Sequence, residues 1–294
     1  MSIFTGAGVA LITPMKEDFS VNYEKLEELV EYQIANHTDC IIICGTTGEA
    51  ATLTTQEHLD VIKACIEYVK GRIPVIAGTG SNCTRTAVML TKEAEKLGAD
   101  GVLLSSPYYN KATQNGLYAH FSEVAKNTKL PIVLYNIAGR TGINITPATV
   151  ARIFNDNENV VAIKEASGDI SQIAAIAQMT DGNIDIYSGN DDQITPILSL
   201  GGKGVISVLS HVAPKETHDI VAEYLAGNVK ESLRLQLKYF PLVKALFSEV
   251  NPIPVKAALN IMGMNVGPLR MPLTEMEPAH QEVLKAEMKK VGII

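Results

Sequence analysis

Val160-Val161-Ala162-Ile163-Lys164-Glu165 is a short apolar run, rich in β-branched residues, that ends in a lysine. The run predicts a buried β-strand, because Val and Ile pack well on a pleated surface that is covered on both faces. Lys164 then lies where the strand ends. Most lysines at such a place extend into solvent, but an amine in a partly apolar site loses its charge more easily and can form a Schiff base. The ends of the other strands are needed to choose between these interpretations.

Seven more short apolar runs occur along the chain, separated by amphipathic stretches of helical period. A spacing of about 25–35 residues is that of βα units with parallel strands, and eight units predict a closed (β/α)8 TIM barrel. An open doubly wound sheet is the alternative, but it requires a glycine-rich turn where Thr13-Pro14-Met15 stands. The eight predicted strands are Val9–Ile12, Cys40–Ile43, Pro74–Ala77, Gly101–Leu104, Ile132–Tyr135, Val160–Lys164, Ile184–Ser188 and Gly204–Ser207.

The pattern changes to helices alone after the eighth run. A chain of 294 residues accommodates one barrel and an extension. We therefore predict a barrel over residues 1–225, with the active site at the C-terminal ends of its strands, and a C-terminal helical appendage over residues 226–294 packed on it. The predicted helices are Pro214–Leu225, Val229–Phe247, Ile253–Met262 and Glu277–Val291.

Composition and charge exclude several kinds of partner. The net charge is −7 and the lysines and arginines are scattered, which argues against nucleic acid and anionic membranes. No apolar run reaches the roughly 18 residues of a membrane span, and the first residues lack the pattern of a signal peptide. The expected location is the cytoplasm.

Neither the cysteines nor the acidic residues form a metal-binding motif. The four cysteines lack CxxC spacing, and the two in apolar runs are expected to be buried thiols. Asp191 and Asp192 have no accompanying HxH or HExxH motif, and at least one of them is expected to cap the next helix. We predict no metal and no organic cofactor.

Polar residues follow most of the predicted strands, and in such barrels the strand ends form the active site. Each group has an ordinary explanation as a turn, a helix cap, rim packing or an exposed charge. Together they bring hydroxyls, phenols, a guanidinium and one amine to a single barrel mouth, as imine chemistry on a carboxylate substrate requires. The groups are Gly45-Thr46-Thr47-Gly48-Glu49, Gly78-Thr79-Gly80-Ser81-Asn82, Pro107-Tyr108-Tyr109-Asn110, Tyr135-Asn136 with Arg140-Thr141-Gly142, Val161–Glu165 and Ser188-Gly189-Asn190-Asp191-Asp192.

In this order these motifs resemble the dihydrodipicolinate synthase family, which belongs to the pyruvate-dependent class I aldolases together with N-acetylneuraminate lyase. The similarity extends over nearly the whole chain. It implies a lyase that condenses pyruvate with L-aspartate 4-semialdehyde to give 4-hydroxy-tetrahydrodipicolinate, in diaminopimelate and lysine biosynthesis. It also implies a homo-oligomer, which in this family is commonly a tetramer.

The resemblance assigns catalytic roles to four residues. Lys164 would form an imine with pyruvate, and Tyr135, Thr46 and Tyr109 would form a proton relay, with Tyr109 reaching into the site of the neighbouring subunit. A relay is needed because a phenol with an ordinary pKa is a poor base.

Four more residues are expected to bind substrate. By resemblance, Thr47 holds the pyruvate carboxylate with hydroxyl and amide donors, Ile206 lines the pyruvate pocket through its backbone, and Gly189 lies beside it. Arg140 distinguishes the synthases from the sugar-acid lyases, because a guanidinium can clamp the carboxylate of the amino-acid aldehyde. Another pyruvate-dependent aldolase, such as N-acetylneuraminate lyase or a keto-deoxy-sugar-acid aldolase, and a non-catalytic barrel that binds small carboxylates remain the alternatives.

The sequence departs from the family pattern in two places. A proline usually follows Tyr-Asn-x, whereas Ala138-Gly139 stand here, which leaves the orientation of Arg140 open. In lysine-inhibited members the regulatory pocket carries further His and Glu residues, and Thr55 and Thr86 occupy two of those positions here. We therefore expect weak or absent inhibition by L-lysine.

Overall fold

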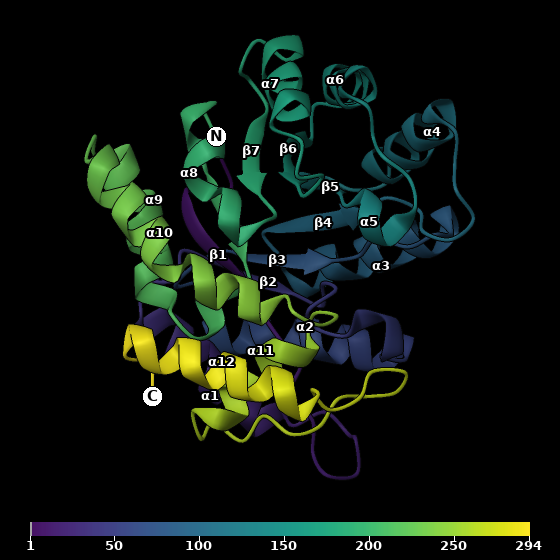
Figure 1. The fold of residues 1–294 in the computed structure, drawn as a ribbon. Coiled ribbons are helices and arrows are strands. Elements are labelled where there is room, and N and C mark those ends of the chain that lie inside the picture. Colours follow the sequence, from purple (N-terminus) through teal and green to yellow (C-terminus); the bar gives the residue numbers. More distant parts are fainter. Residues whose placement is uncertain (1) are drawn as a thin grey trace.

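Eight parallel strands form a closed barrel, and their order around the barrel is their order in the chain (Figure 1). The computed structural model describes residues 2–294. The predicted (β/α)8 TIM barrel is confirmed, and seven of its strands lie within one residue of the predicted bounds at each end. The strands are β1 (Gly6–Ala10), β2 (Cys40–Ile43), β3 (Val75–Gly78), β4 (Gly101–Ser105), β5 (Ile132–Asn136), β6 (Val160–Glu165), β7 (Asp185–Ser188) and β8 (Gly204–Ser207).

The first strand begins three residues before its predicted start. Its glycines lower the sequence signal for a strand, yet there is no room for side chains: a Cβ on Gly8 would lie 2.7 Å from Ile42 Cδ1, and one on Gly6 would meet Asp39. The predicted end is also wrong, because the Ile12 amide donates to His211 Nε2 at 3.0 Å and not to a strand.

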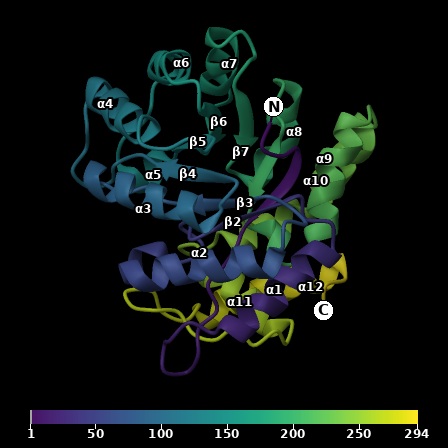
Figure 2. The ribbon, with the colours of Figure 1, turned by 180° about the vertical axis from the view of Figure 1, so that it is seen from behind.

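Helices surround the barrel and cover the outer faces of the strands (Figures 1 and 2). The helix after β2 begins with the capping box expected from its sequence, in which Thr54 and Glu57 bond each other's backbone amides. Up to β8 the helices are α1 (Tyr23–Ala35), α2 (Thr55–Val69), α3 (Thr84–Leu97), α4 (Gln114–Ala125), α5 (Ala138–Thr141), α6 (Pro147–Asp156), α7 (Ile170–Met179) and α8 (Ile194–Ser199). Short 3-10 turns are η1 (Ala50–Thr52), η2 (Asp191–Gln193) and, after β8, η3 (Leu209–His211).

The chain ends in four helices, which match the predicted bounds within one residue: α9 (Pro214–Leu225), α10 (Val229–Leu246), α11 (Ile253–Ile261) and α12 (Pro278–Val291). Helix α10 packs against α9 and α12, and α12 also contacts α11. In both ribbon views α12 lies on the same side of the barrel as α1 and α2, away from α6 and α7 (Figures 1 and 2). None of the helices within residues 2–294 combines the length and the apolar character needed to cross a bilayer.

One apolar cluster fills the inside of the barrel, and a second, larger one fills the layer between the strands and the helices. Near the N-terminal ends of the strands, the interior is closed by Phe4 and Tyr187, whose rings stack with centroids 4.3 Å apart. Each fully buried Ile or Leu in these clusters contributes about 1.5–3 kcal/mol to folding. The interior is therefore a packed core near the N-terminal ends of the strands. Only the end formed by the C-terminal ends of the strands, called the upper end below, is available for a site.

Candidate active site

Tyr135 and Lys164 lie side by side at the upper end of the barrel interior. Parallel pairing of β5 with β6 places the two residues in register, and both point inward with Val133 and Ala162. The Lys164 ammonium nitrogen lies 4.5 Å from the centre of the Tyr135 ring. Lys164 therefore enters the barrel and does not extend into solvent.

Burial changes the chemistry of both groups. Only 6% of Lys164 is exposed, and burial lowers the pKa of its amine to about 8; the Asp191 carboxylate opposes this change and the Arg140 charge adds to it. Burial raises the pKa of the Tyr135 phenol to about 12, which the Arg140 charge and a hydrogen bond with Thr46 partly offset. A neutral, nucleophilic amine is thus accessible near neutral pH, beside a phenol that holds its proton.

Gly189 and Ile206 form the wall around the lysine. A Cβ built on Gly189 would lie 3.2 Å from Lys164 Cε and 2.7 Å from the Ala166 side chain, so a side chain here would crowd the lysine. Ile206 is buried on β8 and belongs to the same interior cluster as Tyr135. Both predicted residues therefore lie at the lysine's end of the barrel interior.

The turn after β2 places Thr46 and Thr47 at this mouth. Thr46 lines the cavity there, close enough to Tyr135 for its hydroxyl to lower the pKa of that phenol. Thr47 is buried, and its Oγ1 accepts a hydrogen bond of 2.9 Å from Asn251 Nδ2. Because Asn251 uses a lone pair of that hydroxyl, its proton is available for an acceptor such as a carboxylate.

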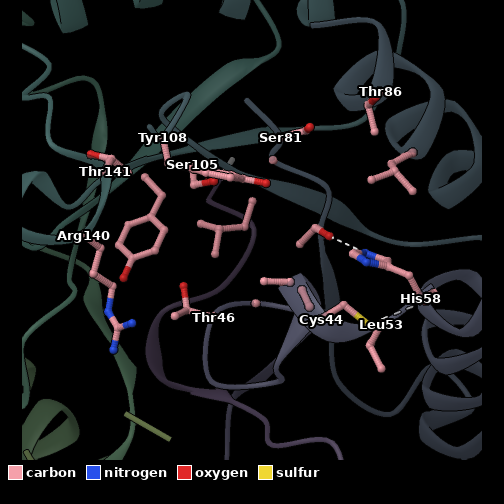
Figure 3. Close-up of a pocket in the computed structure, with 18 of the residues that line it drawn as sticks. Cys44, Thr46, Leu53, His58, Ser81, Thr86, Ser105, Tyr108, Arg140 and Thr141 are labelled. Carbon is pink, nitrogen blue, oxygen red and sulfur yellow. Dashed lines mark hydrogen bonds between the residues drawn. The ribbon is translucent and has the colours of Figure 1, made fainter. Parts of the chain in front are cut away.

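Arg140 lies on α5 at the rim of the barrel, where its Nη2 donates to the backbone oxygen of Asn251 at 2.9 Å. Figure 3 shows its guanidinium directed toward the same space as Thr46. The Ala138-Gly139 sequence therefore still allows the guanidinium to reach the mouth, and its backbone partner fixes its direction.

Tyr109 lies apart from this group in its own chain. It is 91% exposed, has a left-handed backbone with φ 72°, and is absent from the lining of the cavity. Tyr108, by contrast, lines the cavity. A large aromatic side chain in open solvent is unusual, and the part of the chain that the structure describes gives Tyr109 no role of its own.

A cavity of ≈ 460 Å³ opens beside Tyr135 and extends toward α2 and α3 (Figure 3). Its first part carries Thr46, Tyr135 and Arg140. In its far part, His58 Nε2 is bonded to the backbone oxygen of Gly78 at 2.8 Å. The other polar residues of the lining are Thr55, Ser81, Thr86, Ser105, Tyr108 and Thr141. The volume suits a small polar molecule.

Asp191 has a different role from the one expected. The expectation that Asp191 or Asp192 caps the next helix is wrong, because the N-cap residues are Asn190 for η2 and Gln193 for α8. Instead, the buried Oδ2 of Asp191 accepts from the amides of Val208 and Leu209, both at 3.0 Å. Its Oδ1 is buried without a partner in the described chain. Asp191 therefore places a negative charge near Lys164 and ties the end of β7 to the turn after β8.

Sequence reasoning missed Asn251, which contacts both Thr47 and Arg140. It stands more than 200 residues from Thr47, and no local motif marks it. Within residues 2–294, no group of three or more His, Cys, Asp and Glu side chains is arranged to hold a metal ion.

A (β/α)8 barrel with a buried lysine, a phenol and hydroxyls at its mouth is typical of aldolases that work through an imine.

Comparison with known proteins shows which family within this class the chain resembles. The model of the dihydrodipicolinate synthetase family matches residues 3–291. A 4-hydroxy-tetrahydrodipicolinate synthase of Lachnoclostridium phytofermentans is 63% identical over 294 residues, which cover 100% of both chains. One of Clostridium perfringens is 56% identical over 292 residues, covering 99% of this chain and 100% of the relative. The crystal structure of dihydrodipicolinate synthase from Thermotoga maritima superposes with a TM-score of 0.97 at 46% identity, covering 100% of both chains.

The chain belongs to the dihydrodipicolinate synthetase family. The resemblance noted in the sequence and the prediction of a lyase are both confirmed.

Proposed function

We propose that this protein condenses pyruvate with L-aspartate 4-semialdehyde through an imine on Lys164 and releases 4-hydroxy-tetrahydrodipicolinate for diaminopimelate and lysine biosynthesis. The observation that carries the proposal is the buried Lys164 amine, 4.5 Å from the Tyr135 ring, with its pKa lowered to about 8. Family membership supports the substrates, because the curated relatives are synthases of this product.

The reaction proceeds by bonds that these residues can make and break. The Lys164 amine adds to the pyruvate carbonyl and water leaves, which gives the imine. Loss of a methyl proton gives an enamine, and its carbon attacks the aldehyde of the second substrate. The amine of that substrate then displaces Lys164 and closes the ring. Each step moves a proton, and Tyr135 and Thr46, which line the same cavity, are the groups proposed to pass it on.

Two groups of the site suit the two carboxylates. Thr47 can donate its hydroxyl proton to the pyruvate carboxylate, because Asn251 occupies a lone pair of the hydroxyl. Arg140, at the rim, can clamp the carboxylate of the aldehyde substrate with two parallel N–H donors. Gly189 has no side chain that would crowd the Lys164 amine, and Ile206 is buried in the same interior cluster as Tyr135.

Oligomerisation completes the site in this proposal. Tyr109 is exposed in its own chain and is proposed to enter the relay of a neighbouring subunit in a homotetramer. An apolar stripe on α10 offers a further contact between copies, since Val229, Leu233, Leu237 and Phe240 are between 37% and 60% exposed. We place the enzyme in the cytoplasm and treat residues 226–294 as a helical unit packed on the barrel.

Reductive trapping tests the imine. Borohydride is added to the protein with pyruvate, and peptide mass spectrometry locates the reduced adduct. We expect the adduct on Lys164 and no turnover by Lys164→Ala. An unmodified Lys164, or a variant as fast as the parent, would refute the mechanism. Assaying L-aspartate 4-semialdehyde against N-acetylmannosamine as acceptor distinguishes the synthase from a sugar-acid lyase.

A further inference from the structure

The turn that carries Thr46 and Thr47 ends in a strained, buried residue. Glu49 has φ 54° and ψ 32°, the left-handed conformation that residues other than glycine avoid at a cost of about 1–2 kcal/mol. Its side chain is fully buried. Such strain persists only where the surrounding structure fixes the residue. The contacts of Glu49 therefore show which parts of the chain hold the turn in place.

Those contacts come from the C-terminal region of the chain. Lys256, on α11, donates to Glu49 Oε1 at 2.6 Å, and the side chains are 1% and 0% exposed. The amide of Arg270 donates to Glu49 Oε2 at 3.0 Å, and Lys256 also donates to the backbone oxygen of Pro268 at 2.8 Å. Both oxygens of the buried carboxylate are therefore held by residues more than 200 positions away.

The same turn is fixed from its other side by the barrel. Thr13 Oγ1 donates to the Gly48 oxygen at 2.6 Å, and a Cβ on Gly48 would lie 3.0 Å from the Leu11 oxygen. The Glu49 amide donates back to the Thr46 oxygen at 3.1 Å, so Glu49 closes the loop over the two threonines. A shift of Glu49 moves the Thr46 and Thr47 donors with it.

We propose that the buried pair of Lys256 and Glu49 positions the Thr46-Thr47 turn and thereby sets the affinity for pyruvate. The inference rests on the proposed function, since it takes Thr47 as the carboxylate donor. Neither Lys256 nor Glu49 is among the residues that line the cavity. Both are positioning residues, and the C-terminal helices are part of the substrate-binding apparatus.

A purely structural role for the pair predicts a different result. Removing one partner of a buried ion pair leaves an orphaned charge, which lowers stability strongly and by itself leaves the pyruvate affinity of the folded fraction unchanged. A positioning role predicts weaker pyruvate binding in protein that is folded. Melting temperature and pyruvate affinity must therefore be measured on the same samples.

The test compares Lys256→Met, Glu49→Gln and the double variant Lys256→Met/Glu49→Gln with Lys244→Met as the matched control. The double variant leaves no charge at this buried pair, so we expect it to fold even where a single change does not. Lys244 also lies in the C-terminal region and pairs with Asp192 at 3.0 Å, but its side chain is 60% exposed. We measure KM for each substrate, kcat, and the Kd for pyruvate by calorimetry.

We expect the double variant to raise the KM and Kd for pyruvate about tenfold or more, equivalent to one misplaced hydrogen bond, and to lower kcat as well because Thr46 shifts with the turn. The KM for the aldehyde substrate should change less than about threefold. The Lys244→Met control should match the parent. A folded double variant with the parent's pyruvate affinity would overturn the proposal. Failure of borohydride trapping on Lys164 of the parent would instead refute the imine mechanism. The two failures can be told apart, because calorimetry detects pyruvate binding whether or not an imine forms.

Discussion

Tyr135 and Lys164 face each other across neighbouring strands, and the lysine nitrogen lies 4.5 Å from the centre of the tyrosine ring. This neighbourhood leaves the ammonium poorly solvated and lowers the pKa of the amine, whereas the negative charge of Asp191 raises that pKa. Desolvation and the acidic neighbour act in opposite directions on the amine. The balance between them determines how much neutral lysine is present at a given pH.

The first prediction concerns the pH dependence of pyruvate capture. With a pKa of about 8, about a tenth of Lys164 is neutral at pH 7, so kcat/KM for pyruvate should rise about tenfold per pH unit below pH 8 and level off above it. Asp191→Asn removes the charge that raises this pKa and should move the midpoint to lower pH. A midpoint near 10.5, the value of an exposed lysine, would contradict the assignment.

The second prediction is that the reactive lysine destabilises the fold. At pH 7 Lys164 is mostly charged in both the folded and the unfolded protein. Burial of this ammonium in the folded protein costs desolvation free energy, which the unfolded protein avoids. Lys164→Met should therefore abolish turnover yet increase the free energy of unfolding, by on the order of 2–3 kcal/mol. The gain should shrink as pH rises from about 8 to 10.5, where the lysine in the folded protein is neutral. Thermal unfolding at pH 7 and pH 10 measures both, and an unchanged Tm at pH 7 would count against the burial argument.

The third prediction concerns the residues behind the pair. Asn136 and Glu165 follow Tyr135 and Lys164 on the outward side of the same strands, and Asn136 Nδ2 donates to both Glu165 oxygens at 3.2 and 3.1 Å. Gln172 Nε2 donates to the same carboxylate at 3.1 Å. In Glu165→Gln the new side-chain NH2 group would face the NH2 groups of Asn136 and Gln172, so one hydrogen bond would be lost. The resulting shift of the strand end should displace Lys164 and lower kcat about tenfold.

A control separates this effect from lost stability. In the double variant Asn136→Asp/Glu165→Gln a carboxylate again faces an amide, so part of kcat should return. Equal losses in the single and double variants would show that the orientation of this bond does not matter.

Local patterns predicted most of this fold and the positions of Lys164 and Tyr135 at the ends of their strands. Cys40–Ile43 and Gly204–Ser207 have the predicted bounds, because a strand buried on both faces is visible in a few consecutive residues. Lys164 and Tyr135 were found because barrel topology brings all strand ends together. The contacts of Asn251 and Lys256 could not be found this way. They join residues 204 and 207 positions apart, and their side-chain types occur on any helix.

The fourth prediction is that L-lysine inhibits weakly. The far part of the cavity is lined by Thr55, His58 and Thr86, and no Asp or Glu is among its lining residues, so a lysine ammonium would find no carboxylate there. Thr86→Glu should supply one and tighten inhibition about tenfold or more, while Thr86→Gln, of similar size, should not. Inhibition of the parent by low-micromolar L-lysine in a steady-state assay would contradict this reading of the cavity.

The fifth prediction is that Tyr109 acts in a neighbouring subunit, which a mixing experiment can decide. Lys164→Met and Tyr109→Phe are each expected to be strongly impaired as pure proteins. When subunits are exchanged between them, a Tyr109→Phe chain keeps its own Lys164 and can receive Tyr109 from a Lys164→Met chain. One complete site then forms in each mixed pair, and activity should rise well above the sum of the separate samples. If Tyr109 served only its own chain, no mixed site would be complete and activity would stay at that sum. Mixing Lys164→Met with Tyr135→Phe is the control, because Tyr135 is buried in its own barrel and no exchange can complete the site of that chain.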